Sequence, residues 1–193
     1  TSYLVQGPIH KQRWIYSCSK QLLDRVIWAY GERDGLDFTL FRPFNWVGPR
    51  LDSIDAAKEG SSRVVTQFIA ALVYGEPIYL VDGGSQSRSF TYIDDGIAGL
   101  MRIIENKDGC ASGRIFNLGN PANNCSIKDL AEMLLKMFKQ HPLHVSDTSY
   151  SEIIVQDSQS FYGDSYQDIQ IRVPPIENAA KHLCWQPTVA LED

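Results

Sequence analysis

The chain has 193 residues, 44% of them hydrophobic, and a formal net charge of −5 at pH 7. This balance excludes wholesale disorder and is typical of one well-buried domain or of a large part of a two-lobed enzyme. An acidic chain without a basic run is a poor partner for nucleic acid or for an anionic membrane. No apolar run approaches the roughly 18 residues of a membrane span, and no signal peptide is visible. We therefore expect a cytoplasmic protein.

The spacing of the cysteines and histidines predicts neither disulfide bonds nor a metal site. The cysteines are scattered without C-x-x-C spacing, at Cys18, Cys110, Cys125 and Cys184. They are expected to be reduced thiols of a cytosolic protein. His141 and His144 form an isolated H-x-x-H pair without neighbouring ligands, so a loop explains them better than zinc.

The first predicted elements are a helix and a strand. Residues 1–12 look like a loop, and apolar residues then recur at helical spacing from Trp14 to Tyr30. The stretch GERDGLD is expected to break this helix. Phe38 to Phe41 predicts a short buried strand that Pro43 stops.

The middle of the chain predicts a second helix and two strands. Residues 61–74 open with serines and carry an apolar stripe, and Gly75 is expected to end the helix. PIYLVDGG predicts a strand that runs into a Gly-Gly turn, with QSRSFTYI as a second strand of a hairpin. Asp94 or Asp95 is expected to cap a helix from Ile97 to Glu105.

The last part predicts one strand and two helices. RIFNLGNP is a strand and a turn, and Ser126 is expected to cap the following helix, with Asp129 in its first turn. Residues 144–160 are polar and weakly patterned. IENAAKHL, after the Pro-Pro pair, predicts another helix. Alternating strands and helices favour an α/β fold with a parallel sheet, and no internal repeat is evident.

The sequence contains no G-x-G-x-x-G motif, which normally announces a dinucleotide site between a strand and a helix. The Asp82-Gly83-Gly84 turn is not followed by a predicted helix, so it is no substitute. If the chain belongs to a nucleotide-cofactor enzyme, we expect the half that cradles the pyrophosphate to lie outside it.

Tyr16 and Lys20 share one face of the first predicted helix, one turn (about 6 Å) apart. An ammonium beside a phenol favours the phenolate, and such a pair can remove a proton from a sugar hydroxyl. A tyrosine at a helix edge beside a solvated lysine would show the same spacing. The pair alone does not decide between these interpretations.

The wider motif order closely resembles the extended short-chain dehydrogenase/reductase family. The stretches that carry this resemblance are the Tyr-x-x-x-Lys helix, FRPFNWVGPR, YLVDGGSQSRSFTYIDDG, FNLGNP and CWQP. RWIYSCSKQLLDRVIWAYGE, LFRPFNWVGPRLD and FYGDSYQDIQIR are more narrowly similar to the UDP-glucuronic acid decarboxylase domain of bifunctional polymyxin-resistance enzymes. The similarity covers nearly the whole chain.

The resemblance implies the C-terminal half of an NAD(P)-binding Rossmann-type fold. Residues 1–50 would be the last part of the Rossmann domain, and residues 51–193 mainly a smaller α/β lobe for the UDP-sugar. Some segments of that lobe would return to the Rossmann domain. The Gly-rich loop, the Ser/Thr partner of the tyrosine and an acidic catalytic residue would precede Thr1, so the chain alone is expected to be inactive.

The resemblance also implies which residues meet the cofactor, NAD. Tyr16 would be the active-site phenol and Lys20 its partner, which also bonds the nicotinamide ribose. Pro43 would sit beside the nicotinamide.

Six residues would line the sugar-nucleotide pocket by the same resemblance. Arg13 and Asn45 match contacts to the nucleotide sugar, and Arg88 matches the arginine that holds the diphosphate, although a surface arginine on a hairpin is the alternative. Tyr79 stands where the decarboxylase has lysine, a departure that could turn one contact into stacking on uracil.

Tyr166 and Arg172 match a late tyrosine and arginine of the pocket. The arginine is assigned as a proton donor in the decarboxylase, but a guanidinium is a reluctant acid and could instead grip a carboxylate or phosphate. The alternative interpretation of Arg172 is a solvated side chain before Pro174.

The implied activity is NAD-dependent oxidative decarboxylation of UDP-glucuronic acid to a UDP-4-keto-pentose, which feeds aminoarabinose modification of lipid A and polymyxin resistance. Within the family, a UDP-xylose synthase or a UDP-sugar 4-epimerase is the rival hypothesis. An inactive fragment that serves as a binding or assembly module is the rival of another class. The resemblance further implies a homo-oligomer through the Tyr16 helix and allows a formyltransferase domain fused upstream.

Overall fold

The computed structural model describes residues 7–12, 14–60, 62–142, 152–162 and 168–193. Its helices are α1 (Trp14–Asp34), α2 (Ile54–Lys58), α3 (Val64–Tyr74), α4 (Ile93–Glu105), α5 (Ile127–Gln140), α6 (Ser158–Tyr162) and α7 (Glu177–Leu183). Its strands are β1 (Thr39–Pro43), β2 (Trp46–Val47), β3 (Ile78–Val81), β4 (Ser87–Ser89), β5 (Thr91–Tyr92), β6 (Arg114–Leu118), β7 (Asn124–Ser126), β8 (Ile153–Gln156) and β9 (Ile171–Arg172).

The strands form small sheets in which parallel pairing dominates. β1 pairs with β6, β2 with β5, β3 with β8 and β4 with β9, all parallel, whereas β4 pairs with β7 antiparallel. These pairings confirm the predicted α/β class with parallel strands. The predicted hairpin is wrong, because β3 and β4 each pair with segments far along the chain. The turn between them contains Gly83 and Gly84, both at positive φ, and it leads the chain away from an antiparallel return.

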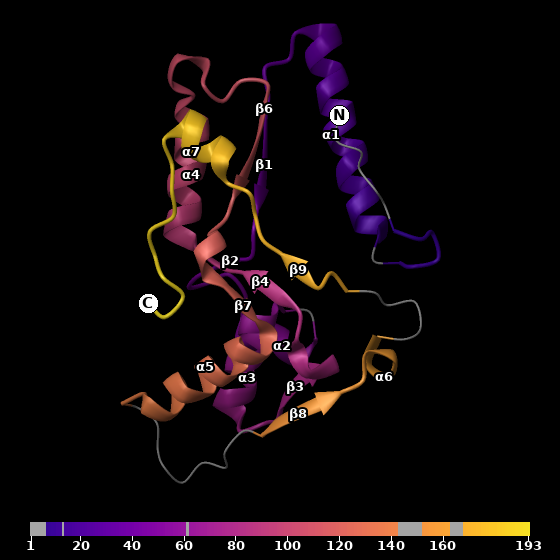
Figure 1. Cartoon of the computed structure of the whole chain (residues 1–193), viewed down its shortest axis with the longest axis vertical. Helices are drawn as coiled ribbons and strands as arrows, with labels where there is room; N and C mark the ends of the chain where they lie inside the picture. The colour runs from indigo at the N-terminus through magenta and orange to yellow at the C-terminus, as the bar shows by residue number, and fades with distance from the viewer. Residues whose placement is uncertain (1–6, 13, 61, 143–151, 163–167) are drawn as a thin grey trace.

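One hydrophobic core lies on the α4 and α7 side of the β1–β6 pair (Figure 1). Phe116 and Leu118 of β6 are fully buried there. Ile103 of α4 and Leu183 of α7 pack against them, together with Trp185. This core holds α4 and the C-terminal segment against β6.

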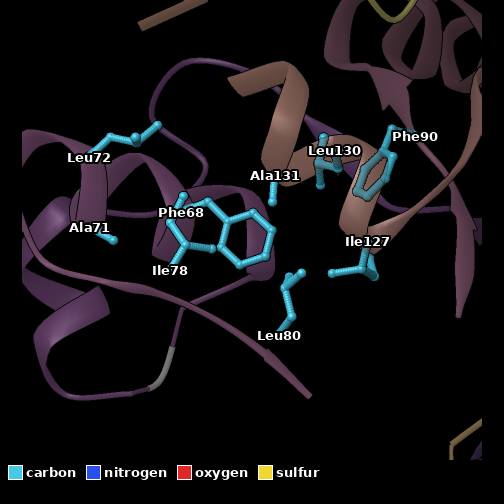
Figure 2. Close-up of a cluster of buried hydrophobic side chains, with 9 residues drawn as sticks. All are labelled: Phe68, Ala71, Leu72, Ile78, Leu80, Phe90, Ile127, Leu130 and Ala131. Atoms are coloured by element: carbon cyan, nitrogen blue, oxygen red, sulfur yellow. The ribbon is translucent and has the colours of Figure 1, made fainter. Parts of the chain in front are cut away.

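A second core fills the space between α3, α5 and the β3–β8 pair. Figure 2 shows the Phe68 ring of α3 directed between Ile78 and Leu80 of β3 and Ala131 of α5. Ile78 and Leu80 are each 1% exposed. This core supports β3, whose Tyr79 and Val81 line the candidate site.

Helix α1 stands to one side of the β1–β6 pair (Figure 1) and has no buried residue. An Asp24–Arg42 ion pair of 2.6 Å joins it to β1, and an edge-to-face contact joins Trp28 to Phe38, the residue before β1. The predicted helix is confirmed, but the predicted break is misplaced. The helix runs through the first four residues of GERDGLD and ends before Gly35, whose φ is +67°.

Strand β1 is confirmed, but it is not buried as predicted. Its burial falls from partly buried at Thr39 to exposed at Pro43, and Phe41 is 41% exposed. Pro43 is the last residue of the strand. Among the described residues β1 pairs only with β6, so its other edge lacks the neighbour that would bury it.

The helix boundaries confirm some predicted caps and correct others. Gly75 ends α3 in the left-handed conformation, and the Ser126 hydroxyl accepts from Asp129 N, as predicted. The Asp94 or Asp95 cap is wrong, because α4 begins at Ile93 and its N-cap residue is Tyr92. The weakly patterned stretch before residue 160 contains β8, which has only four residues and a distant partner.

The structure also bears on whether the chain has a membrane-spanning helix or a metal site. In the described part of the chain, no helix is long and apolar enough to cross a membrane. The same part holds no group of three or more side chains that could hold a metal. His141 belongs to that part, and His144 lies outside the described residues.

Candidate functional site

A cavity of about 780 Å³ opens between α3, β3, β4 and β9. Its lining includes four of the predicted substrate-binding residues: Asn45, Tyr79, Arg88 and Arg172. Asn45 belongs to the turn that follows the carboxyl end of β1, the place where open parallel sheets bind ligands. A smaller cavity of about 330 Å³ adjoins it and shares Val47, Arg63 and Val65.

The turn after β1 aims Asn45 at the cavity. Its φ of 40° is in the left-handed region, which asparagine tolerates better than most residues. Its backbone oxygen accepts from Thr91 N at 3.2 Å, and its Nδ2 donates to Ser89 O at 2.9 Å. The amide oxygen, Oδ1, is the atom that this side chain can offer to a ligand donor.

Arg88 lies in β4 and is 9% exposed, so it is not a surface arginine on a hairpin. Nη1 donates to Ser87 O and Ile169 O, both at 2.7 Å. Nη2 donates to Asp168 Oδ1 at 2.6 Å. A buried guanidinium requires such partners, because an unpaired buried charge is costly.

Arg172 is the register partner of Arg88 on the neighbouring strand. Its guanidinium lies over the Phe44 ring, 5.4 Å from the ring centroid. Like charges directly opposite on paired strands repel each other, and a carboxylate already pairs with one of the two. Lys58 and Arg63 also line the cavity, so its described lining carries four cationic side chains against the two carboxylates of Glu76 and Asp168, an excess that suits an anionic ligand.

Aromatic side chains form another part of the wall. Tyr79 projects from β3 and is 48% exposed. Tyr74, at the end of α3, also lines the cavity, and Lys58 Nζ lies 4.1 Å from its ring centroid. An exposed phenol ring at a cavity mouth can stack on a planar base.

Cys125 is the β7 register partner of Arg88. Burial first, and then the charges of Asp129 and Glu192, raise the pKa of its thiol to about 11. Because the thiolate is the nucleophilic form, a thiol with this pKa reacts slowly at neutral pH.

Tyr16 and Lys20 form a close pair away from the cavity. Lys20 Nζ lies 5.3 Å from the Tyr16 ring centroid, and the phenol is 68% exposed. Pro43, at the end of β1, is also exposed. None of these three residues lines either cavity, so the described structure does not join the predicted catalytic pair to the predicted substrate residues.

Two predicted site residues, Arg13 and Tyr166, lie outside the described residues. Sequence reasoning missed Asp168, which pairs with Arg88 at 2.6 Å with both side chains largely buried. The available signal was the acidic residue four positions before Arg172 in YQDIQIR. A buried arginine needs a carboxylate, but the sequence does not show that Arg88 is buried.

Residues 1–119 match the NAD dependent epimerase/dehydratase family. The chain belongs to this family. It is an NAD-dependent enzyme family of the extended short-chain dehydrogenase/reductase type, which confirms the broad resemblance and the Rossmann-type fold class.

Solved structures share the fold of this chain. The PbgP3 protein from Burkholderia pseudomallei is 52% identical, with a TM-score of 0.82 over 100% of this chain and 53% of that one. The UDP-glucuronic acid 4-epimerase from Bacillus cereus, in complex with UDP-glucuronic acid and NAD, is 22% identical, with a TM-score of 0.74 over 100% and 54%. The dTDP-glucose 4,6-dehydratase from Bacillus anthracis, in complex with NAD, is 15% identical, with a TM-score of 0.72 over 98% and 50%. The last two show the fold, and the chain spans about half the length of all three.

Proposed function

We propose that this epimerase/dehydratase chain serves in the NAD-dependent oxidative decarboxylation of UDP-glucuronic acid to a UDP-4-keto-pentose. The observation that carries the proposal is the cavity in which Asn45, Tyr79, Arg88 and Arg172 converge. These are residues that the resemblance to UDP-glucuronic acid decarboxylase domains assigns to the nucleotide sugar. The cavity volume lies within the roughly 300–1,000 Å³ of small-molecule sites.

The charge of the cavity suits this substrate. UDP-glucuronic acid carries a diphosphate and a carboxylate, and guanidinium groups offer planar forks of donors to both. Arg88 is held in place by Asp168 and Ile169, which suits an arginine that grips the diphosphate. Arg172 is exposed beside it and could bind the carboxylate or govern protonation of the decarboxylated carbon.

The residues present fit one end of NAD. The Tyr16 phenol and the Lys20 ammonium lie together on an exposed helix face, the donor set that suits the nicotinamide ribose. The sequence offers no G-x-G-x-x-G for the pyrophosphate, and the turn at Asp82–Gly84 leads to strand β4 rather than to a helix. We therefore propose that this chain supplies Tyr16, Lys20 and Pro43 to the cofactor and that the preceding half supplies the Gly-rich loop.

When bound, NAD would supply the oxidant for C4 of the sugar. Tyr16, with Lys20 beside it, takes the proton of the 4-hydroxyl group. The 4-keto acid then loses CO2 from the adjacent C5, because the new ketone stabilises the resulting enolate. Asn45 and Arg88 hold the nucleotide sugar during these steps.

The test is NADH absorbance after NAD+ and UDP-glucuronic acid are added to the protein extended upstream to include the Gly-rich loop. Stoichiometric NADH would support net oxidation to the 4-keto-pentose. Loss of substrate without NADH would instead indicate a closed redox cycle, as in a UDP-xylose synthase or a 4-epimerase. Intact substrate would favour a binding or assembly module.

Several wider expectations belong to the same proposal. The division at residue 50 into a Rossmann part and a substrate lobe, cytoplasmic location, an upstream formyltransferase domain and a role in lipid A modification all stay predictions. Self-association through α1 is supported by its exposed apolar side chains, including Leu22, Leu23 and Val26. Sedimentation of the protein at several concentrations would test it.

A further inference from the structure

Asp168 stands at the centre of the contacts between β4 and the segment that carries Arg172. Its Oδ1 accepts from Arg88 Nη2 at 2.6 Å and from Ile169 N at 2.7 Å. The neighbouring backbone adds two contacts to β4: Ile169 O accepts from Arg88 Nη1, and Gln170 O accepts from Ser87 N at 2.7 Å. The carboxylate therefore links the guanidinium to the backbone of the opposite strand.

These contacts use only part of the donor set of Arg88. A guanidinium has five N–H donors in a fixed plane. Among the described residues, Nη1 donates to Ser87 O and Ile169 O, and Nη2 donates once to Asp168. The Nε–H and one Nη2–H remain, and guanidinium N–H groups are good donors to phosphate oxygens.

We propose that Asp168 is a positioning residue, which fixes the Arg88 guanidinium so that its remaining N–H donors face the diphosphate of the nucleotide sugar. Asp168 itself does not touch the substrate. The inference rests on the proposed function, because it assumes that the cavity binds a nucleotide diphosphate. Asp168 lines this cavity next to both arginines.

If Asp168 served only as a counter-charge to Arg88, its substitutions would have the opposite effect on the binding of a diphosphate. If the carboxylate were only a counter-charge, it would compete with the diphosphate for Arg88, and its neutralisation would tighten binding. If it positions the guanidinium, the acceptor oxygen matters more than the charge. Asparagine keeps an oxygen at the same place, whereas glutamate keeps the charge and moves the oxygen by one methylene group.

The experiment measures the binding of UDP and of uridine to Asp168→Asn and Asp168→Glu by calorimetry and ligand-observed NMR. It uses the protein extended to include the Gly-rich loop. We expect D168N to bind UDP within about threefold of the parent and D168E to bind it about tenfold or more weakly. Uridine, which has no phosphate, should bind all three proteins equally.

Asp24 offers a matched control, because it forms another 2.6 Å pair with an arginine, Arg42, outside the cavity. D24N and D24E should leave UDP affinity unchanged. Tighter UDP binding by D168N, parental UDP binding by D168E, or an equal loss of UDP and uridine would each overturn the inference. Failure of the parent protein to bind UDP would contradict the proposed function itself. That outcome is distinct from failure of the Asp168 inference, because it is seen without any variant.

Discussion

Replacement of Asp95 by alanine should release Thr188 and Val189 from α4. The side chain is 6% exposed, and its carboxylate accepts from Thr188 N, Thr188 Oγ1 and Val189 N, all at 3.0 Å. At about 1 kcal/mol net for each donor, the three bonds amount to about 3 kcal/mol. The exposed position of Thr188 keeps the cost near this sum, because water can reach the freed donors. This is a large share of the roughly 5–15 kcal/mol that stabilises a typical domain.

Urea unfolding followed by circular dichroism would measure the change in the free energy of unfolding. Hydrogen exchange at Thr188 and Val189 would show whether the loss is local. Asp94→Ala is the matched control, because Asp94 lies in the same helical turn but is exposed, and it should cost less than about 0.5 kcal/mol. Equal stability of D95A and D94A would refute the reasoning. Trp185 Nε1 bonds the backbone oxygen of Asp95, so that contact is expected to survive in both variants.

Three further predictions follow from single side chains. Because burial raises the pKa of the Cys125 thiol to about 11, iodoacetamide at pH 8 should label it far more slowly than the exposed Cys184; mass spectrometry showing equal rates would contradict this. Partial burial, followed by the Arg114 charge, lowers the pKa of His182 from its ordinary 6.5. The unfolded chain then binds more protons between the two values, so the free energy of unfolding should rise with pH through that window. His182→Gln should flatten this rise, and an NMR titration midpoint at or above 6.5 would refute it. Tyr16→Phe should lower kcat for UDP-glucuronic acid about 100-fold or more and leave the melting temperature unchanged, because the phenol is 68% exposed; full activity would remove Tyr16 from the proposed mechanism.

Local signals in the sequence predicted local structure well. The apolar spacing from Trp14, the hydroxyl of Ser126 and the glycine at 75 each act within a few residues, and each corresponds to an element or a cap in the structure. The boundary errors have local causes too. Gly31 is compatible with a helix interior, so the helix passes it and ends before Gly35, where a positive φ is needed.

The sequence by itself therefore determined the longer helices, the α/β class and, through motif order, the family, whereas the five-residue helices α2 and α6 were not predicted. Only the tertiary structure decided which distant strands pair, because four-residue strands such as β3 carry no mark of their partner. It also decided that Arg88 is buried against Asp168, 80 residues further along the chain. Burial depends on every segment that packs around a residue, whereas a helix or a cap depends on its near neighbours. The fold brings four predicted substrate residues to one cavity, and the spacing of residues in the sequence does not show this. They are Asn45, Tyr79, Arg88 and Arg172.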